Sequence, residues 1–176
     1  MWLINTHNGI RGKLKRIQIE DYPAVKAHLD QYWDKISKRA DKGDTPYNLR
    51  NCAYLEDFSK PKVIYPETTL GAYFALDGDG YFIDKTGFIL ISKDAEYLQK
   101  TLSSKLFEYA YKKIFSSVEL GANGYQYNKH ALIKLPILPF SNTTLYATDS
   151  DFYKMYNLND EEIELVEDYI AEVRSH

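Results

Sequence analysis

Short apolar runs separated by turn-forming residues occupy the middle of the chain, and they constrain its fold most strongly. Lys62–Tyr65 is a β-branched and aromatic run that a proline stops, and Leu70–Leu76 is followed by the turn Asp77–Gly80. Two further runs follow at Tyr81–Ile83 and Phe88–Ser92. Short runs between turns that contain glycine or proline predict strands joined as antiparallel hairpins.

A first helix is predicted over about residues 22–41, before these runs. Asp21 is its predicted N-cap, a proline follows in the first turn, and apolar residues recur at three-to-four spacing. Gly43 is predicted to end the helix. Four cations near its C-terminal end lie at i, i+3, i+4 and i+7 and would form one basic stripe: Lys35, Lys38, Arg39 and Lys42. The stripe fits two roles, binding phosphates or complementing the helix dipole.

Helical spacing returns after the predicted strands. Residues 94–114 are predicted as two helices, because the serine pair at 103–104 interrupts the pattern. Leu132–Leu138 is apolar but contains a proline, which indicates an edge strand or an extended segment. Asn159 is predicted to cap a last helix in which Glu162 completes a capping box. The sum predicts a single α+β domain, with an antiparallel or mixed sheet flanked by helices.

Composition bounds the class of protein. The 176 residues suffice for one domain, and 44% of them are hydrophobic and 27% charged. A single cysteine, Cys52, excludes an internal disulfide and predicts a cytoplasmic location. No apolar run approaches the roughly 20 residues of a membrane span, so no membrane partner is expected.

Charge is distributed unevenly along the chain, although the net charge is only −3. Lys and Arg outnumber Asp and Glu by 12 to 8 in residues 1–62, match them at 8 to 8 in residues 63–148, and fall to 2 against 9 in residues 149–176. A basic first part can face a polyanion while the acidic end faces solvent or another domain. Chance scatter of charge in a small domain gives the same distribution.

Motifs of autonomous catalysis are absent from the sequence. Neither a G-x-G-x-x-G nor a phosphate-binding G-x-x-x-x-G-K-[ST] motif occurs. The turn Asp77–Gly80 opens like a calcium loop, but Phe82 and Phe88 stand where that loop needs glycine and glutamate. The four histidines are scattered, and Cys52 has the surroundings of a small core residue. We therefore expect no catalytic residue, metal or cofactor in this chain.

Basic and amide side chains are the candidates for binding nucleic acid. Residues 8–16 alternate glycines with four cations, as in a loop that follows a phosphate backbone or in a soluble terminus: Arg11, Lys13, Lys15 and Arg16. Arg50, between apolar and aromatic neighbours, is predicted to be half buried and to pair with a carboxylate, a backbone carbonyl or guanine. Further candidates lie in predicted turns or at a strand end: Asn48, Lys62, Asn123, Gln126 and Lys129.

Two adjoining stretches, Thr45–Tyr54 and Phe58–Glu67, resemble the TaqI-like C-terminal specificity (target-recognition) domain of type II and type IIG adenine-specific DNA methyltransferases and restriction-modification enzymes. The resemblance covers most of residues 20–140. Further matching elements follow in the family's order: Tyr81–Ile91, Tyr97–Leu98, Leu102–Phe107, Gly124–Lys129 and Leu135–Pro139. Most of these residues are apolar, aromatic, Pro or Gly, so they indicate scaffold rather than contacts to bases.

The resemblance implies the partners and the division of the chain. In the family this domain follows an adenine N6-methyltransferase domain and recognises double-stranded DNA, sometimes with a nuclease further upstream. The family's Asn-Pro-Pro-Tyr motif and its S-adenosylmethionine-binding motif have no counterpart here, so that cofactor is expected in the parent's catalytic domain. Residues 1–176 then form one target-recognition domain, with a basic segment 1–20, a family-like core 21–140 and an acidic helix 159–173. The alternative is a protein-interaction module that docks through this acidic helix.

Overall fold

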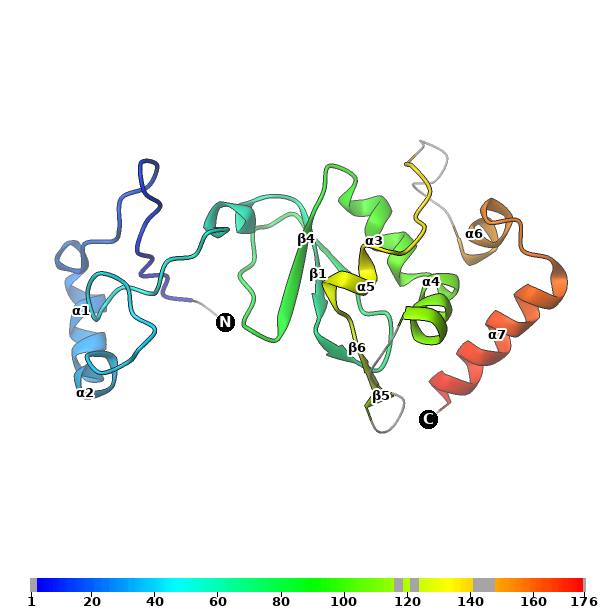
Figure 1. Cartoon of the computed structure of the whole chain (residues 1–176). Helices are drawn as coiled ribbons and strands as arrows, with labels where there is room; N and C mark the ends of the chain where they lie inside the picture. The colour runs from blue at the N-terminus through cyan, green and yellow to red at the C-terminus, as the bar shows by residue number, and fades with distance from the viewer. Residues whose placement is uncertain (1–2, 116–118, 121–123, 141–147, 176) are drawn as a thin grey trace. The chain divides into compact units, whose positions relative to one another are not determined.

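The computed structural model describes residues 3–115, 119–120, 124–140 and 148–175 (Figure 1). The chain divides into two compact units, Met1–Glu56 and Asp57–His176. Helices combine with two three-stranded antiparallel sheets, which confirms the predicted α+β class. The prediction of one target-recognition domain over the whole chain concerns function and stays a prediction.

Unit 1 contains three short helical elements instead of the single helix predicted over 22–41. They are η1 (Ile19–Asp21), α1 (Pro23–Asp30) and α2 (Trp33–Ile36). Asp21 ends η1, and the N-cap position of α1 is occupied by Tyr22, whose side chain makes no cap hydrogen bond. The predictions of Asp21 as a cap and of a helix through residue 41 are therefore wrong.

The interruption of the helix coincides with contacts to Tyr47. Its hydroxyl donates a hydrogen bond of 2.5 Å to the carboxylate of Asp30, the last residue of α1. Its ring centroid lies 5.4 Å from that of Trp33, the first residue of α2. Gly43 does not end a helix; its N–H donates to the carbonyl oxygen of Asn48 at 2.8 Å.

Hydrogen bonds hold the interior of unit 1. Among the described buried hydrophobic residues, Ile19 is the one from this unit. Asn48 is 1% exposed, and its amide nitrogen donates to the carbonyl oxygens of Ile17 at 2.9 Å and His7 at 3.4 Å. Its amide oxygen accepts from the hydroxyl of Thr45 at 2.7 Å. One buried amide thus joins three segments that are distant in sequence.

The first sheet of unit 2 has β1 (Lys62–Pro66) between β3 (Ala75–Asp77) and β4 (Gly87–Ile91). The predicted strands at 62–65 and 88–92 are confirmed to within a residue. Only the end of the run 70–76 pairs as a strand, and residues 81–83 form none. The short 3-10 helix η2 (Leu55–Ser59) precedes β1.

The second sheet consists of three short strands in the order β2 (Thr68–Thr69), β6 (Gly124–Gln126) and β5 (Glu119–Leu120). After β6 the chain enters α5 (Lys129–Leu132), whose N-cap Asn128 accepts a hydrogen bond from the N–H of residue 131. No strand forms over residues 132–138: Leu132 ends α5, residues 133–134 form a turn directly after it, and residues 136–138 have no regular secondary structure.

Side-chain caps mark the starts of the later helices of unit 2. Ser104 separates α3 (Ala95–Ser103) from α4 (Lys105–Ala110), which confirms the predicted break, and η3 (Tyr111–Phe115) continues α4 as a π-helical turn. Both capping boxes near the C-terminus form, before α6 (Asp149–Met155) and before α7 (Asp160–Arg174), so the predicted box of Asn159 and Glu162 is confirmed.

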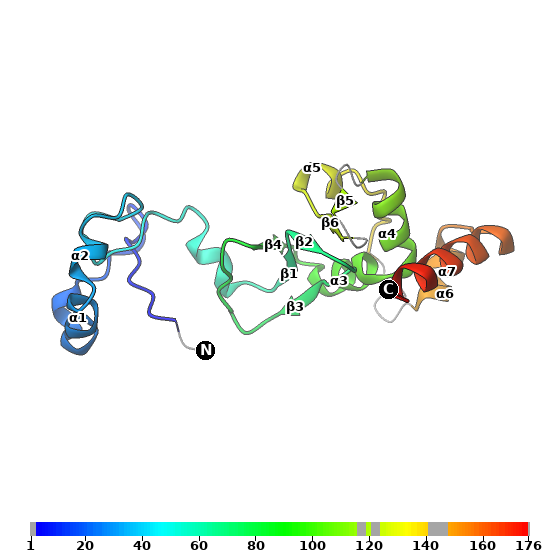
Figure 2. The same cartoon turned by 90° about the horizontal axis from the view of Figure 1, so that it is seen from below.

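Helix α7 packs against α4 rather than against a sheet. Both views show it on the side of α4 away from β1 (Figures 1 and 2). The core of unit 2 lies between β1 and the helices and is rich in tyrosine. Tyr111, Tyr125 and Tyr127 are each no more than 2% exposed, and the hydroxyls of the last two lie 3.0 Å apart. Their hydroxyls find partners inside the core, as buried tyrosines require.

Candidate nucleic-acid interface

A tight turn at residues 10–14 presents the first group of cations in unit 1. Ile10 and Leu14 exchange backbone hydrogen bonds of 2.8 and 2.9 Å, and the N–H of Lys13 donates to the carbonyl oxygen of Ile10 at 2.9 Å. Gly12 occupies the third turn position with φ of 78°, while Arg11 before it has no positive φ. This combination fits a type II turn, which favours glycine at that position because φ is positive there.

Gly9 allows the two arms of the turn to approach each other. Its φ is 78°, and a Cβ atom placed on it would lie 2.4 Å from the carbonyl oxygen of Leu14 and 2.7 Å from the N of Arg16. These neighbours are backbone atoms, so they cannot rotate away as a side chain would. The two glycines, Gly9 and Gly12, therefore allow the turn to close.

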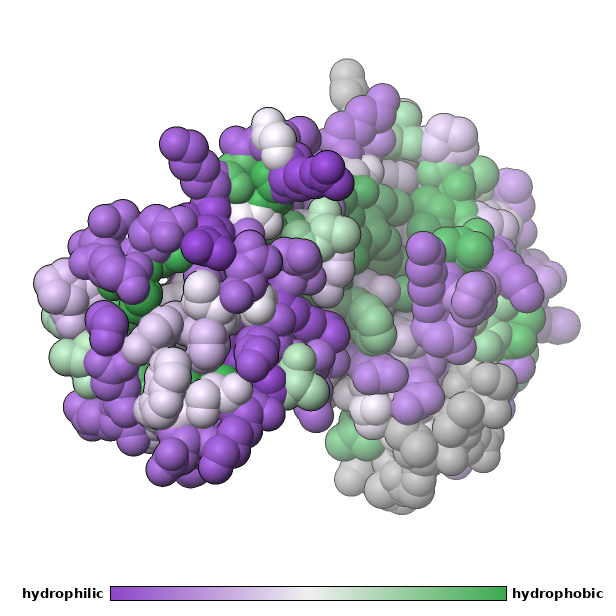
Figure 3. Space-filling model, turned by 60° about the vertical axis from the view of Figure 1, so that its left-hand side comes forward, coloured by the Kyte–Doolittle hydropathy of each residue, from purple (hydrophilic) through white to green (hydrophobic). Residues whose placement is uncertain are grey.

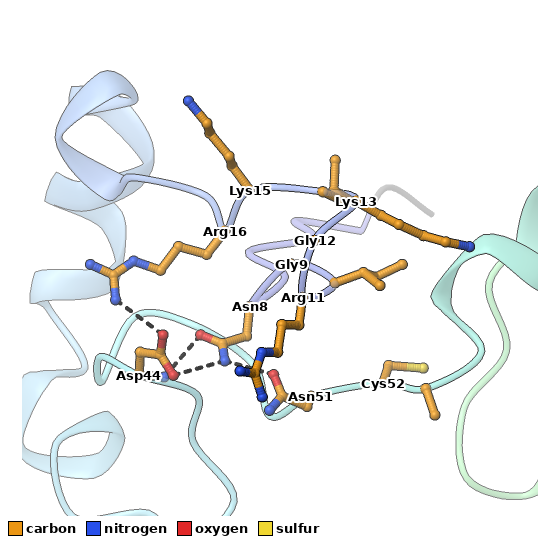
Figure 4. A pocket seen from close by; sticks show the side chains of 13 residues that line it. Asn8, Gly9, Arg11, Gly12, Lys13, Lys15, Arg16, Asp44, Asn51 and Cys52 are labelled. Atoms are coloured by element: carbon orange, nitrogen blue, oxygen red, sulfur yellow. Dashed lines mark hydrogen bonds and ion pairs between the residues drawn. The ribbon is translucent and has the colours of Figure 1, made fainter.

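The turn forms one wall of an open groove within unit 1 (Figure 4). The opposite wall consists of Asp44 and residues 51–53. All four predicted cations of the N-terminal segment line this groove: Arg11, Lys13, Lys15 and Arg16. The face of unit 1 that Figure 3 turns toward the viewer is mostly hydrophilic.

Two of the four cations have acidic partners. Arg16 lies 3.3 Å from the carboxylate of Asp44, and Lys13 lies 3.1 Å from that of Glu56. Within the described residues, Arg11 and Lys15 form no ion pair. The groove therefore keeps positive charge that no neighbouring carboxylate neutralises.

A chain of polar side chains connects the two walls of the groove. Asn8 donates from its amide nitrogen to Asp44 at 3.0 Å and to the amide oxygen of Asn51 at 2.7 Å. Its own amide oxygen accepts from the backbone N–H of Asp44 at 2.9 Å. Asn8 and Asn51 were not among the predicted site residues, although the glycine after Asn8 and the arginine before Asn51 are signals that could have drawn attention to them.

The predicted basic stripe does not exist as a helical face, because α2 ends at Ile36. Arg39 turns inward and donates to the carbonyl oxygens of Pro46 at 3.2 Å and Asn48 at 2.7 Å. Lys42 donates to the carbonyl oxygen of Ser37 at 3.0 Å. Lys35 and Lys38 are exposed and remain available for a ligand.

Two predicted binding residues are buried and serve the fold. Asn48 uses both ends of its amide in unit 1, and Lys62 is fully buried in unit 2, paired with Asp77 and bonded to the carbonyl oxygen of Phe58. Neither side chain can reach a base without unfolding its surroundings, so we withdraw both as DNA contacts. Arg50 is more exposed than predicted, at 71% of its side chain, but it does pair with a carboxylate, one of the predicted alternatives: it lies 3.6 Å from that of Asp41.

The remaining predicted residues belong to unit 2. Lys129 is exposed at the start of α5, and Gln126 is half buried in β6. Asn123 lies outside the described residues. The structure thus brings the four cations of residues 11–16 together in one groove and distributes the other candidates elsewhere.

The described residues offer neither a cluster of metal ligands nor a membrane-spanning helix. Within the described ranges, no three His, Cys, Asp or Glu side chains gather where they could hold a metal ion. In the same ranges, every helix is too short or too polar to cross a membrane.

Comparisons with known proteins identify the family of the chain. A search of curated proteins finds no match to the chain. The family model of the TaqI-like C-terminal specificity domain matches residues 8–137, which is 130 of the 176 residues and includes the whole basic turn. The chain therefore belongs to the TaqI-like C-terminal specificity domain family, and this membership implies a role in recognising DNA targets in restriction-modification.

Proposed function

We propose that this chain binds double-stranded DNA sequence-specifically through the groove of unit 1. A catalytic domain acting with it would then methylate an adenine, cleave the DNA, or do both. The observation that supports the proposal best is the turn of residues 10–14, which places Arg11 and Lys15 in a groove without an acidic partner among the described residues. DNA as the partner also fits a cytoplasmic location, which we include in the proposal.

The groove can exchange its own ion pairs for phosphates at little cost. The side chains of Lys13 and Glu56 are 66% and 53% exposed, and those of Arg16 and Asp44 are 35% and 61% exposed. Solvent-exposed pairs contribute only about 0–1 kcal/mol to stability. A DNA phosphate near Lys13 or Arg16 therefore competes with a weak interaction, and its binding releases counterions from the DNA.

The chemistry of methylation belongs to the associated domain in this proposal. That domain would bind S-adenosylmethionine and take the target adenine out of the base stack, since the reacting nitrogen is inaccessible inside a duplex. The chain described here would set the position and orientation of that domain on the DNA by its contacts to phosphates and bases.

The alternative, a protein-interaction module that docks through its acidic helix, has less support. The apolar side of α7 is already buried, since Val166 and Ile170 are 2% and 1% exposed. Within unit 2, Glu167 binds Lys105 at 2.5 Å and accepts a hydrogen bond from Tyr153 at 2.7 Å. These contacts give α7 a structural role in its own unit.

Salt-dependent DNA binding tests the proposal. We would measure the affinity of the full chain for a mixed-sequence duplex by fluorescence anisotropy between about 50 and 200 mM salt. The double variant Lys13→Ala/Lys15→Ala removes two cations of the groove. We expect weaker binding and a slope of log K against log salt that is shallower by about 1.8, at about 0.9 per phosphate contact.

The matched control removes two cations of unit 2. Lys93 and Lys134 are exposed and form no ion pair with any residue that the structure describes. Lys93→Ala/Lys134→Ala changes the net charge equally and should leave the slope unchanged. Absence of DNA binding at low salt, or equal slopes for the two double variants, would contradict the proposed groove.

A further inference from the structure

We propose that Arg11 and Asn51 form a base-reading pair for guanine and the base pair next to it. Arg11 donates to the N7 and O6 atoms of guanine in the major groove, and Asn51 donates to an acceptor on the adjacent base pair. This inference rests on the proposed DNA-binding function and assigns specificity to two residues of the groove.

Hydrogen bonds fix the orientation of the two amides at the groove. The nitrogen of Asn8 lies 3.0 Å from the carboxylate of Asp44, which only accepts, and the oxygen of Asn8 accepts from the backbone N–H of Asp44. Asn8 is therefore held at both ends, and its orientation follows from its partners.

The orientation of Asn51 follows from that of Asn8. The nitrogen of Asn8 donates at 2.7 Å, so the atom of Asn51 that faces it is the amide oxygen. The NH2 group of Asn51 must then point away from Asn8. Because Asn51 is exposed and lines the groove, this NH2 group is a donor held ready for a ligand.

Arg11 supplies the second set of donors. It is exposed, occupies the second position of the type II turn, and pairs with no carboxylate in the described part of the chain. It lines the same groove as Asn51, and in the view of Figure 4 its side chain extends from the turn toward the Asn8–Asn51 pair. A guanidinium donates through a planar fork and accepts nothing.

The chemistry of these groups selects the base edge. Guanine shows two adjacent acceptors, N7 and O6, in the major groove, which match the fork of an arginine. Adenine places a donor beside its N7, and the minor groove shows only single acceptors on A·T pairs. Arg11 therefore fits guanine, and the NH2 group of Asn51 fits an N7 or O4 atom of the neighbouring pair.

Neither variant of the pair removes the charge of the groove or its fold. Arg11→Lys keeps one positive charge for phosphates but loses the planar fork. Asn51→Ala removes the outward donor, while Asn8 remains bound to Asp44 through two hydrogen bonds. Lys15→Ala is the matched control, because its side chain is expected to contact phosphate alone. Thermal unfolding of each variant verifies that it folds.

The test selects preferred duplexes from a randomised library with the full chain and each variant. We expect a guanine preference that falls about tenfold or more in Arg11→Lys, and a preference at the adjacent position that falls about as much in Asn51→Ala. Lys15→Ala should weaken binding to all sequences equally and leave both preferences intact. Replacing the selected guanine by 7-deazaguanine, which lacks the N7 acceptor, should reproduce the loss in the wild-type chain and add nothing in Arg11→Lys.

The two proposals fail in different ways. Absence of DNA binding at low salt contradicts the proposed function itself. Binding without a guanine preference, or preferences that survive both Arg11→Lys and Asn51→Ala, overturns the base-reading pair while DNA binding stands. A loss that 7-deazaguanine does not reproduce overturns the contact of Arg11 to N7.

Discussion

Replacing Lys62 by methionine should destabilise unit 2 by about 3 kcal/mol at neutral pH. Lys62 is fully buried against Asp77, which is 5% exposed, and loss of one partner of a buried ion pair costs about 3–5 kcal/mol. We expect the lower end, because three backbone N–H groups, those of Asp79, Gly80 and Tyr81, still bind the carboxylate at 2.8–3.2 Å. Methionine fills the space of the lysine stem.

The pH dependence of this effect provides a second measurement. Burial alone would raise the pKa of Asp77, but the hydrogen bond from Lys62 and those from the backbone outweigh it and hold the pKa below its usual value. The stabilisation from Asp77 is thus present above about pH 4 and is lost as the pH falls through the lowered pKa of the folded state. Without Lys62 this pKa rises, so the cost of Lys62→Met should shrink in acid.

Urea unfolding followed by circular dichroism measures the loss of stability, since the fluorescence of Trp33 reports on unit 1 instead. Lys60→Met is the control. The side chain of Lys60 is 53% exposed and lies 2.6 Å from the carboxylate of Asp57. Exposed pairs of this kind contribute about 0–1 kcal/mol, so this variant should lose little stability. The reasoning is refuted if both variants unfold at the same urea concentration, or if the cost of Lys62→Met does not change between neutral and acid pH.

Three further substitutions test other parts of the structure. Gly9→Ala should lower the unfolding midpoint of unit 1, measured by tryptophan fluorescence, more than Gly12→Ala does. A Cβ atom at position 12 meets no atom within 4 Å, so Gly12→Ala costs only about 1 kcal/mol for the positive φ. Equal shifts would contradict the steric role of Gly9. Glu108→Gln should lower the free energy of unfolding in urea by about 3 kcal/mol. It leaves the ammonium group of Lys112, whose side chain is only 6% exposed, without its carboxylate partner. A loss below about 1 kcal/mol would show that the pair is unimportant. Asn159→Ala should lower the helical content and the stability of unit 2 by about 1 kcal/mol, and an unchanged melting curve would argue against the capping box.

Local signals predicted the elements that depend on local contacts. The break at Ser104 and the capping box of Asn159 involve atoms three residues apart, and both form as predicted. The single helix predicted over 22–41 does not form, and the contacts at its interruption come from residues distant in sequence. Its interruption lies between Asp30 and Trp33, and both contact Tyr47, which is 17 and 14 residues away along the chain.

The cations of the candidate site could be predicted from the sequence, but the roles of its amide side chains could not. Residues 11–16 could be identified from glycine spacing and charge, and they do share one groove. The orientation of Asn51 depends on Asn8, 43 residues away, and through it on Asp44. Asn48 and Lys62 were misassigned because polar residues are usually exposed, and only the complete fold shows the partners that compensate their burial.

The described residues of unit 1 bury little apolar surface, and the hydrogen-bonded amide of Asn48 lies at the centre of its interior. This composition of the interior determines how unit 1 should respond to heat. Exposure of apolar surface raises the heat capacity of unfolding, whereas exposure of polar surface lowers it. Unit 1 should therefore unfold with a small heat-capacity increment and a nearly linear dependence of stability on temperature. Its stability would rest on hydrogen-bond enthalpy, so the groove would become ordered most firmly in the cold.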